Sequence, residues 1–281
     1  MRVLLILPFI ISVGLPSYKK ITPSKYFSIK SDSSIVHHTL DGSVKEWPSS
    51  MFNIHMISNI SCAIDNDSQN LFIAMKIPDF LMQRKIMQEG LNLYIDLKAK
   101  KDKSNRIEFP IRSENSFTID GLAGKQLTPN ERSKLYKSGS PEREKLIKAM
   151  TALINSMKLS GFDKKETVEQ ELMFDNSVNI AFTWEKEMLY IEYRIPFHLL
   201  GISTVSKRNM TVGLNITAAE MPEGRISSDP YSSNNRPVGI GDQIGHQHDY
   251  TPEGSSTNIH PVNDLEIWTS EQTVWAKYIC H

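Results

Sequence analysis

The segment His38-Thr-Leu-Asp-Gly-Ser-Val-Lys-Glu-Trp-Pro48 indicates the fold class of this chain. Its Asp41-Gly42 pair is a turn signal, because glycine adopts the positive φ angles that many tight turns require. A short apolar approach precedes the turn, and the Trp47-Pro48 pair follows it. We therefore interpret the segment as the opening strand and first corner of a β-sandwich, in which Trp47 is a packing anchor.

Short strand-like segments joined by polar turns make up much of the remaining chain. They are rich in β-branched and aromatic residues at period two, a pattern typical of strands. The expected strands are residues 60–64, 71–77, 91–97, 106–111, 116–119, 178–184, 188–195, 211–218, 265–269 and 274–279. This pattern predicts a mostly β protein with an antiparallel β-sandwich, rather than alternating strands and helices.

Two consecutive helix-start signals interrupt the strands near the middle of the chain. Thr128 precedes Pro129 and Glu131 in an N-terminal capping pattern, and Ser140-Pro-Glu142 starts a second helix. The second helix has an apolar stripe at helical spacing, made of Leu146, Met150, Leu153 and Met157. Gly161 is placed to end it. We expect a helical pair inserted at about residues 128–160 and packed on the sandwich.

Residues 222–261 have the composition of a loop, rich in Ser, Asn, Gly and Pro. A run of about 40 residues without periodicity is long for a compact domain. It is interpreted either as a rim over a binding face or as simple disorder. The predicted organisation is a lead segment at 15–37 and a single β-sandwich domain at 38–281.

Composition and charge limit the classes of function. Apolar residues form 40% of the chain, enough for a substantial core, and charged residues form 23%, which suits a soluble surface. Lys plus Arg and Asp plus Glu both number 32, so the formal net charge is zero. Nucleic-acid binding needs a basic surplus or a basic stripe. We therefore expect no nucleic-acid partner.

The N-terminus has the pattern of a secretory signal. Arg2 precedes an apolar run from Val3 to Val13, which is shorter than the ~20 residues that span a bilayer but matches a signal-peptide core. Cleavage after Gly14 would define a signal peptide at 1–14. We expect an exported protein that is periplasmic, cell-surface or secreted, with no transmembrane segment in the mature chain.

The chain has two cysteines, Cys62 and Cys280. In an exported protein an even number of cysteines permits a disulfide. A bridge that closed so long a loop would add about 4 kcal/mol by chain-entropy reasoning. The alternative is two isolated thiols, and the sequence leaves both open.

Several segments, in order, carry a resemblance to a known family. They are residues 38–48, Asp65-Asn-Asp-Ser-Gln-Asn-Leu-Phe-Ile-Ala-Met-Lys-Ile-Pro-Asp79, Gly90-Leu-Asn-Leu-Tyr-Ile-Asp96, Tyr190-Ile-Glu-Tyr-Arg-Ile-Pro-Phe-His-Leu-Leu-Gly201 and Asp264-Leu-Glu-Ile-Trp268. Together they resemble family 9 carbohydrate-binding modules and their DOMON-like relatives. The resemblance implies a β-sandwich that binds a glycan or a small polar ligand and is not an enzyme.

Face alternation in two of these segments suggests a binding surface. In 91–97 and in 188–195 the apolar residues point one way and the polar and aromatic residues point the other. The candidate ligand-binding residues are Tyr94, Asp96, Tyr190, Glu192, Arg194 and, for stacking, Trp268. Aromatic rings stack on the CH faces of sugars, while carboxylates and guanidinium groups bond their hydroxyls. The alternative is a solvated sheet face with a Glu–Arg cross-strand pair.

The resemblance also implies bound groups. Family 9 modules often carry a structural calcium ion, and Asp41, Asp65 and Asp67 have the oxygen ligands that calcium prefers. DOMON folds also bind haem through Met paired with His or Lys, and this chain has 12 Met residues. The alternatives to non-catalytic glycan binding are therefore a haem-binding DOMON-type module, a cryptic carbohydrate-active hydrolase and a structural envelope protein without a ligand.

Overall fold

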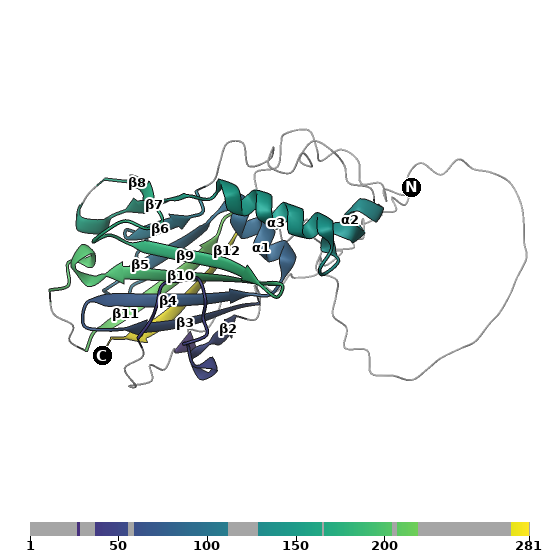
Figure 1. Cartoon of the computed structure of the whole chain (residues 1–281). Coiled ribbons are helices and arrows are strands. Elements are labelled where there is room, and N and C mark those ends of the chain that lie inside the picture. The colour runs from purple at the N-terminus through teal and green to yellow at the C-terminus, as the bar shows by residue number, and fades with distance from the viewer. Residues whose placement is uncertain are drawn as a thin grey trace, which may run out of the picture.

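Two β-sheets stacked face to face form the body of the protein (Figure 1). The computed structural model describes residues 27–28, 37–55, 59–111, 129–164, 166–203, 207–218 and 271–280. One sheet has seven strands and the other has five. All strand pairs are antiparallel except the short parallel pair of β1 with β12. The prediction of a mostly β, two-sheet protein is confirmed.

The strand order defines the two layers. The seven-stranded sheet runs β1 (Phe27–Ser28), β12 (Gln272–Ile279), β11 (Asn209–Ile216), β5 (Leu91–Asp96), β6 (Arg106–Phe109), β7 (Ser156–Ser160) and β8 (Val168–Glu171). The five-stranded sheet runs β2 (Asn53–His55), β3 (Ile60–Asn66), β4 (Asn70–Ile77), β10 (Met188–Pro196) and β9 (Asn179–Glu185). Many neighbours are consecutive strands, but the pairs β4 with β10 and β5 with β11 join distant parts of the chain, so each sheet also depends on long-range pairing.

The core lies between the sheets and is built by period-two alternation. Ile73 and Met75 of β4 and Leu93 and Ile95 of β5 are fully buried in one continuous apolar cluster. Because successive side chains of a strand point to opposite faces, the residues between them lie on the outer faces of the sheets. These outer faces hold all the candidate binding residues that the structure describes.

Three α-helices lie together at one end of the sandwich (Figure 1). The predicted pair is present as α2 (Pro129–Tyr136) and α3 (Pro141–Leu153). Helix α1 (Phe80–Glu89) was not predicted, although Asp79 caps it by accepting a hydrogen bond from the Met82 amide at 2.7 Å. The helices contact one another, since the Arg143 guanidinium of α3 lies 4.0 Å from the centre of the Phe80 ring of α1.

The predicted end of the second helix is wrong. Helix α3 ends at Leu153, and the next residues form strand β7 rather than a further turn up to Gly161. Met157 and Leu159 are buried in the core, while Lys158 and Ser160 are half-buried on the other face. The apolar stripe therefore changes from helical to strand period within a few residues, and Met157 satisfies both patterns.

The opening segment is a turn segment and not a strand. Residues 37–48 contain no strand and lead into the short 3-10 helix η1 (Ser49–Met51) and then into β2. Trp47 is buried, as predicted for a packing anchor, in a second apolar cluster with Val44, Met51, Ala63, Phe72 and Ala74. That cluster lies on the outer face of the five-stranded sheet, so the segment packs on the sheet instead of extending it.

Both cysteines are free thiols. Cys62 belongs to β3 in the five-stranded sheet, and Cys280 follows β12 in the seven-stranded sheet. The Cys280 Sγ lies 4.0 Å from the Met210 Sδ, and burial raises the pKa of the Cys62 thiol to about 12. The disulfide that the sequence permitted is not formed, and the two thiols are buried core residues instead.

Other predictions lie outside the described residues. These are the signal peptide at 1–14, the strands at 116–119 and 265–269, the loop at 222–261 and Trp268. Within the described part of the chain, none of the helices has the length and hydropathy needed to span a bilayer.

Candidate ligand-binding site

The candidate ligand-binding residues lie on two separate surfaces. Tyr94 and Asp96 are on the outer face of β5, in the seven-stranded sheet. Tyr190, Glu192 and Arg194 are on the outer face of β10, in the five-stranded sheet. The two outer faces point in opposite directions, so the expected single binding face is not formed. The alternation of apolar residues correctly placed these side chains on the outer faces of their strands. Strand pairing put the two strands in different sheets, so the side chains do not meet.

On the seven-stranded sheet, Tyr94 is a packed residue. Its ring stacks on Trp275 with the ring centres 5.9 Å apart, across Gly213 of the strand between them. A Cβ at Gly213 would lie 2.8 Å from the Trp275 ring, so any other residue there would require the ring to shift. Tyr94 is 6% exposed, and burial raises the pKa of its hydroxyl.

Asp96 holds the turn between β5 and β6. It is buried and accepts hydrogen bonds from the backbone amides of Lys98, Lys100 and Asp102. Burial alone would raise the pKa of this carboxyl, but the hydrogen bonds from Lys98, Asp102, Lys100 and Lys101 together lower it. With its oxygens engaged in this way, Asp96 has a structural role.

The outer face of the five-stranded sheet is partly covered by residues 37–52, which we call the covering segment. Beneath it, Ala63, Ala74 and Glu192 stand in one cross-strand row, and the small alanines leave room for Trp47. Gly42 approaches the sheet so closely that a Cβ there would lie 2.9 Å from the Phe182 carbonyl carbon. Its φ of +78° also favours glycine.

Glu192 binds the covering segment. The Trp47 indole donates to Glu192 Oε1 at 2.9 Å, and the Gly42 amide donates to Oε2 at 2.9 Å. Glu192 is 3% exposed, and burial raises the pKa of its carboxyl to about 7, despite the opposing effect of these two donors. No ion pair joins Glu192 to Arg194. Across the sheet Glu192 faces Ala74 and Ala181, and Arg194 faces Phe72 and Asn179, so these two residues do not form the cross-strand Glu–Arg pair that was the alternative prediction.

A second buried contact fixes the start of the covering segment. The imidazole of His38 bonds the Asp65 carboxylate at 2.8 Å and stacks on Trp47 with the ring centres 3.9 Å apart. Both side chains of the His38–Asp65 pair are almost fully buried. Sequence reasoning missed His38, because nothing in its neighbourhood distinguishes it from a solvent-exposed histidine before a turn.

The three aspartates that the sequence offered to calcium do not form a cluster. Asp41 and Asp67 accept hydrogen bonds from amides of their own turns, from Ser43 at 2.7 Å and from Asn70 at 2.6 Å. Asp65 bonds His38. The described residues contain no group of three or more acidic, His or Cys side chains arranged to hold a metal ion. Local turn chemistry explains Asp41 and Asp67, and the contact with His38 explains Asp65.

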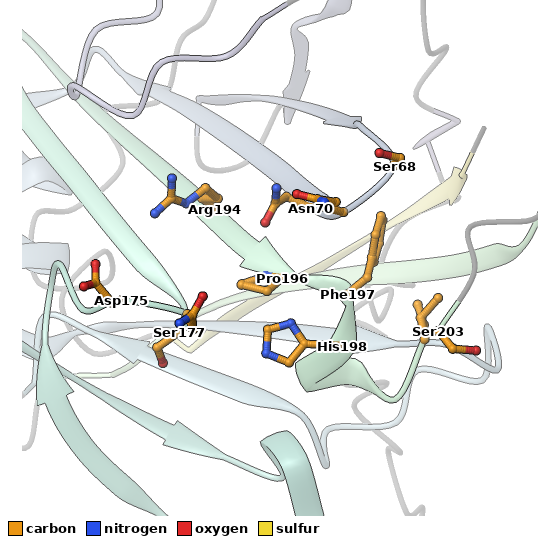
Figure 2. A pocket seen from close by; sticks show the side chains of 12 residues that line it. Ser68, Asn70, Asp175, Ser177, Arg194, Pro196, Phe197, His198 and Ser203 are labelled. Carbon is orange, nitrogen blue, oxygen red and sulfur yellow. The ribbon is translucent and has the colours of Figure 1, made fainter.

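The outer face is open near Arg194, where a pocket of about 750 Å³ lies at one end of the sheet. Figure 2 shows Arg194 beside Asn70 on neighbouring strands, Asp175 and Ser177 on a loop, and His198 on the turn after β10. Polar side chains dominate the lining: Ser68, Gln69, Asn70, Asp175, Asn176, Ser177, Arg194, His198 and Ser203, with Pro196, Phe197 and Ile202. The pocket therefore suits a polar ligand.

Hydrogen bonds hold the loops that form the pocket. Asp67 caps the β3–β4 turn by accepting from the Gln69 amide at 2.7 Å, and the Phe197 amide donates to the Gln69 carbonyl at 2.8 Å. Buried Asn179 accepts from the Phe174 amide at 2.6 Å and donates to the Ser177 carbonyl at 3.1 Å. The pocket is therefore built on two turns that are each tied to the sheet.

The guanidinium, imidazole and carboxyl side chains of the pocket have no partner among the described residues. No hydrogen bond or ion pair within the described chain involves the side chains of Arg194, His198 or Asp175. Arg194 is half-buried on the strand, while His198 and Asp175 are exposed at the rim. A guanidinium in this position offers a planar set of donors to a ligand.

Of the predicted residues that the structure describes, only Arg194 lines this pocket; Asn70, Asp175 and His198 were not predicted. The signal available for them was weak, since Asp65–Ser68 and residues 175–177 have only the composition of polar turns. Comparisons with models of protein families, with curated proteins and with solved structures found no match.

Proposed function

We propose that this protein is an exported, non-catalytic binding protein that holds a small hydroxylated ligand, such as a saccharide, in the pocket at Arg194. The open polar pocket with its unpaired guanidinium carries this proposal. Its volume lies within the range of about 300–1,000 Å³ typical of small-molecule sites. The resemblance of the sequence to family 9 carbohydrate-binding modules and their DOMON-like relatives supports the same class of ligand.

Non-catalytic binding accounts for the composition of the site. Serine hydroxyls and the amides of Gln69, Asn70 and Asn176 donate and accept hydrogen bonds, which matches the dual character of sugar hydroxyls. Hydrolysis of a glycosidic bond generally uses two carboxyl groups on either side of it. Asp175 is the one carboxyl among the described lining residues, so a hydrolase is the less suitable function.

The test is a titration of the purified protein with a panel of mono- and disaccharides, followed by calorimetry and by NMR shifts of the backbone amides. Binding that shifts the amides of residues 68–70 and 175–177 supports the proposal. If no saccharide binds, or if the shifts map to the opposite sheet around Tyr94, the proposal is wrong. An absorbance spectrum of the same sample tests the haem alternative, because bound haem gives an intense Soret band.

A further inference from the structure

We infer that the ligand of this pocket carries a carboxylate, as an acidic sugar does, and that Arg194 binds this group. The inference rests on the proposed function and specifies its ligand class. It starts from the contrast between Arg194 and the carboxylates on the same sheet face.

Within the described chain Arg194 has no hydrogen-bond or ion-pair partner, and the two carboxylates nearest to it on the sheet face are already engaged. Glu192, two residues earlier on β10, bonds Trp47 and Gly42. Asp65 stands in the same cross-strand row as Arg194, with Phe72 between them, and bonds His38. The covering segment thus uses both sheet-face carboxylates, and the pocket's own carboxylate, Asp175, is exposed at the rim and forms no ion pair with Arg194 in the described chain. A half-buried cation of this kind is stabilised by an anionic partner, which the ligand can supply.

The charge of the pocket favours one carboxylate over a phosphate. Arg194 is the only permanently charged cation among the described lining residues, and Asp175 adds a negative charge at the rim. A phosphate dianion would be attracted by one cation and repelled by Asp175. A monoanionic carboxylate matches the planar guanidinium in a two-bond arrangement, while Asp175 and the amides remain available for hydroxyl groups.

The lining of the pocket favours a sugar acid. Its volume of about 750 Å³ exceeds that of a single amino acid or a single sugar ring, and its walls offer many amides and hydroxyls besides the one cation and the one carboxylate. Several neutral donors and acceptors around one cation suit a ring that carries several hydroxyls and one carboxylate.

The experiment compares acid and neutral sugars of the same stereochemistry by calorimetry, at constant ionic strength. The probes are D-glucuronate with D-glucose, D-galacturonate with D-galactose, the corresponding disaccharides, and inorganic phosphate and glycine as other small ions. At least one acid should bind about tenfold more tightly than its neutral partner, or more, which corresponds to about 1.4 kcal/mol.

Variants of the full chain assign the preference to Arg194. Arg194→Gln should remove the preference, so that the acid and its neutral partner bind equally, and Arg194→Lys should retain part of it, because lysine keeps the charge but lacks the planar fork. Arg106→Gln, on the outer face of the opposite sheet, removes the same charge elsewhere and should keep the wild-type preference.

The outcomes separate the two proposals. Equal binding of acid and neutral sugars would overturn the carboxylate inference and leave the saccharide-binding function standing. Phosphate or glycine binding as tightly as the best sugar acid would also overturn it. An acid preference that survives in Arg194→Gln would show that another group binds the carboxylate, so the role of Arg194 would be wrong. Absence of binding by every saccharide overturns the proposed function itself.

Discussion

The outer face of the five-stranded sheet has a covered part and an open part, and they differ in whether their ionisable side chains are bonded to other residues. Under the covering segment, Glu192 and Asp65 are buried and bonded to Trp47, Gly42 and His38. At the open part, Arg194 lies on the same strand as Glu192 and on the same face, yet forms no hydrogen bond or ion pair with the described residues. A polar residue on a sheet face therefore has a structural role where a distant segment covers it, and it is available to a ligand where no such segment does.

Removal of Trp47 tests the covered part most severely. Trp47→Ala deletes a large buried side chain and leaves the Glu192 carboxylate without its indole donor, so we expect the free energy of unfolding to fall by about 3–5 kcal/mol. Denaturant unfolding followed by circular dichroism measures the change. Trp47→Phe keeps most of the apolar surface and should cost less. A loss below about 1 kcal/mol for Trp47→Ala would mean that the covering segment contributes little to the fold.

The pH dependence of stability tests the same contact through Glu192. Its pKa is about 7 in the folded protein against an ordinary value of 4.5, so between these values the folded state holds a proton that the unfolded state has lost. Stability from this group therefore falls as pH rises from about 4.5 to about 7, by up to about 3 kcal/mol at about 1.4 kcal/mol per pH unit.

The control for this prediction is Glu192→Gln, measured by denaturant unfolding at several pH values. The variant has no titrating group at this position, so its stability should fall less over the window than that of the wild type. Asp96 does not interfere, because its pKa lies below its ordinary value and its effect appears at lower pH. Parallel pH curves for variant and wild type would contradict the burial of an ionisable Glu192 in this contact.

The comparison of the two parts also shows which features of the fold could be predicted from the sequence. Alternation of apolar residues was sufficient to predict most strands of both sheets, because each strand buries one face against the same core. It also placed Tyr94 and Arg194 on outer faces. It could not show that β5 and β10 belong to different sheets, since strand pairing is decided by contacts between residues far apart in the chain.

The candidate site was less predictable than the fold. Arg194 was found because it alternates with apolar neighbours, but the same rule also selected Glu192, which is covered. The choice between them depends on Gly42 and Trp47, which lie about 150 residues earlier and meet Glu192 only in the folded protein. Asp175 and His198 join the pocket through turns, where periodicity carries no signal.

The smallest expected effect on stability belongs to the open part. Arg194→Gln removes a half-buried side chain that has no hydrogen bond or ion pair within the described chain, so the free energy of unfolding should change by no more than about 0.5 kcal/mol. Denaturant unfolding beside Trp47→Ala provides the measurement. A loss comparable to that of Trp47→Ala would show that Arg194 is a structural residue like Glu192, and the distinction between covered and open parts would fail. A near-neutral result would show that the fold does not need this arginine.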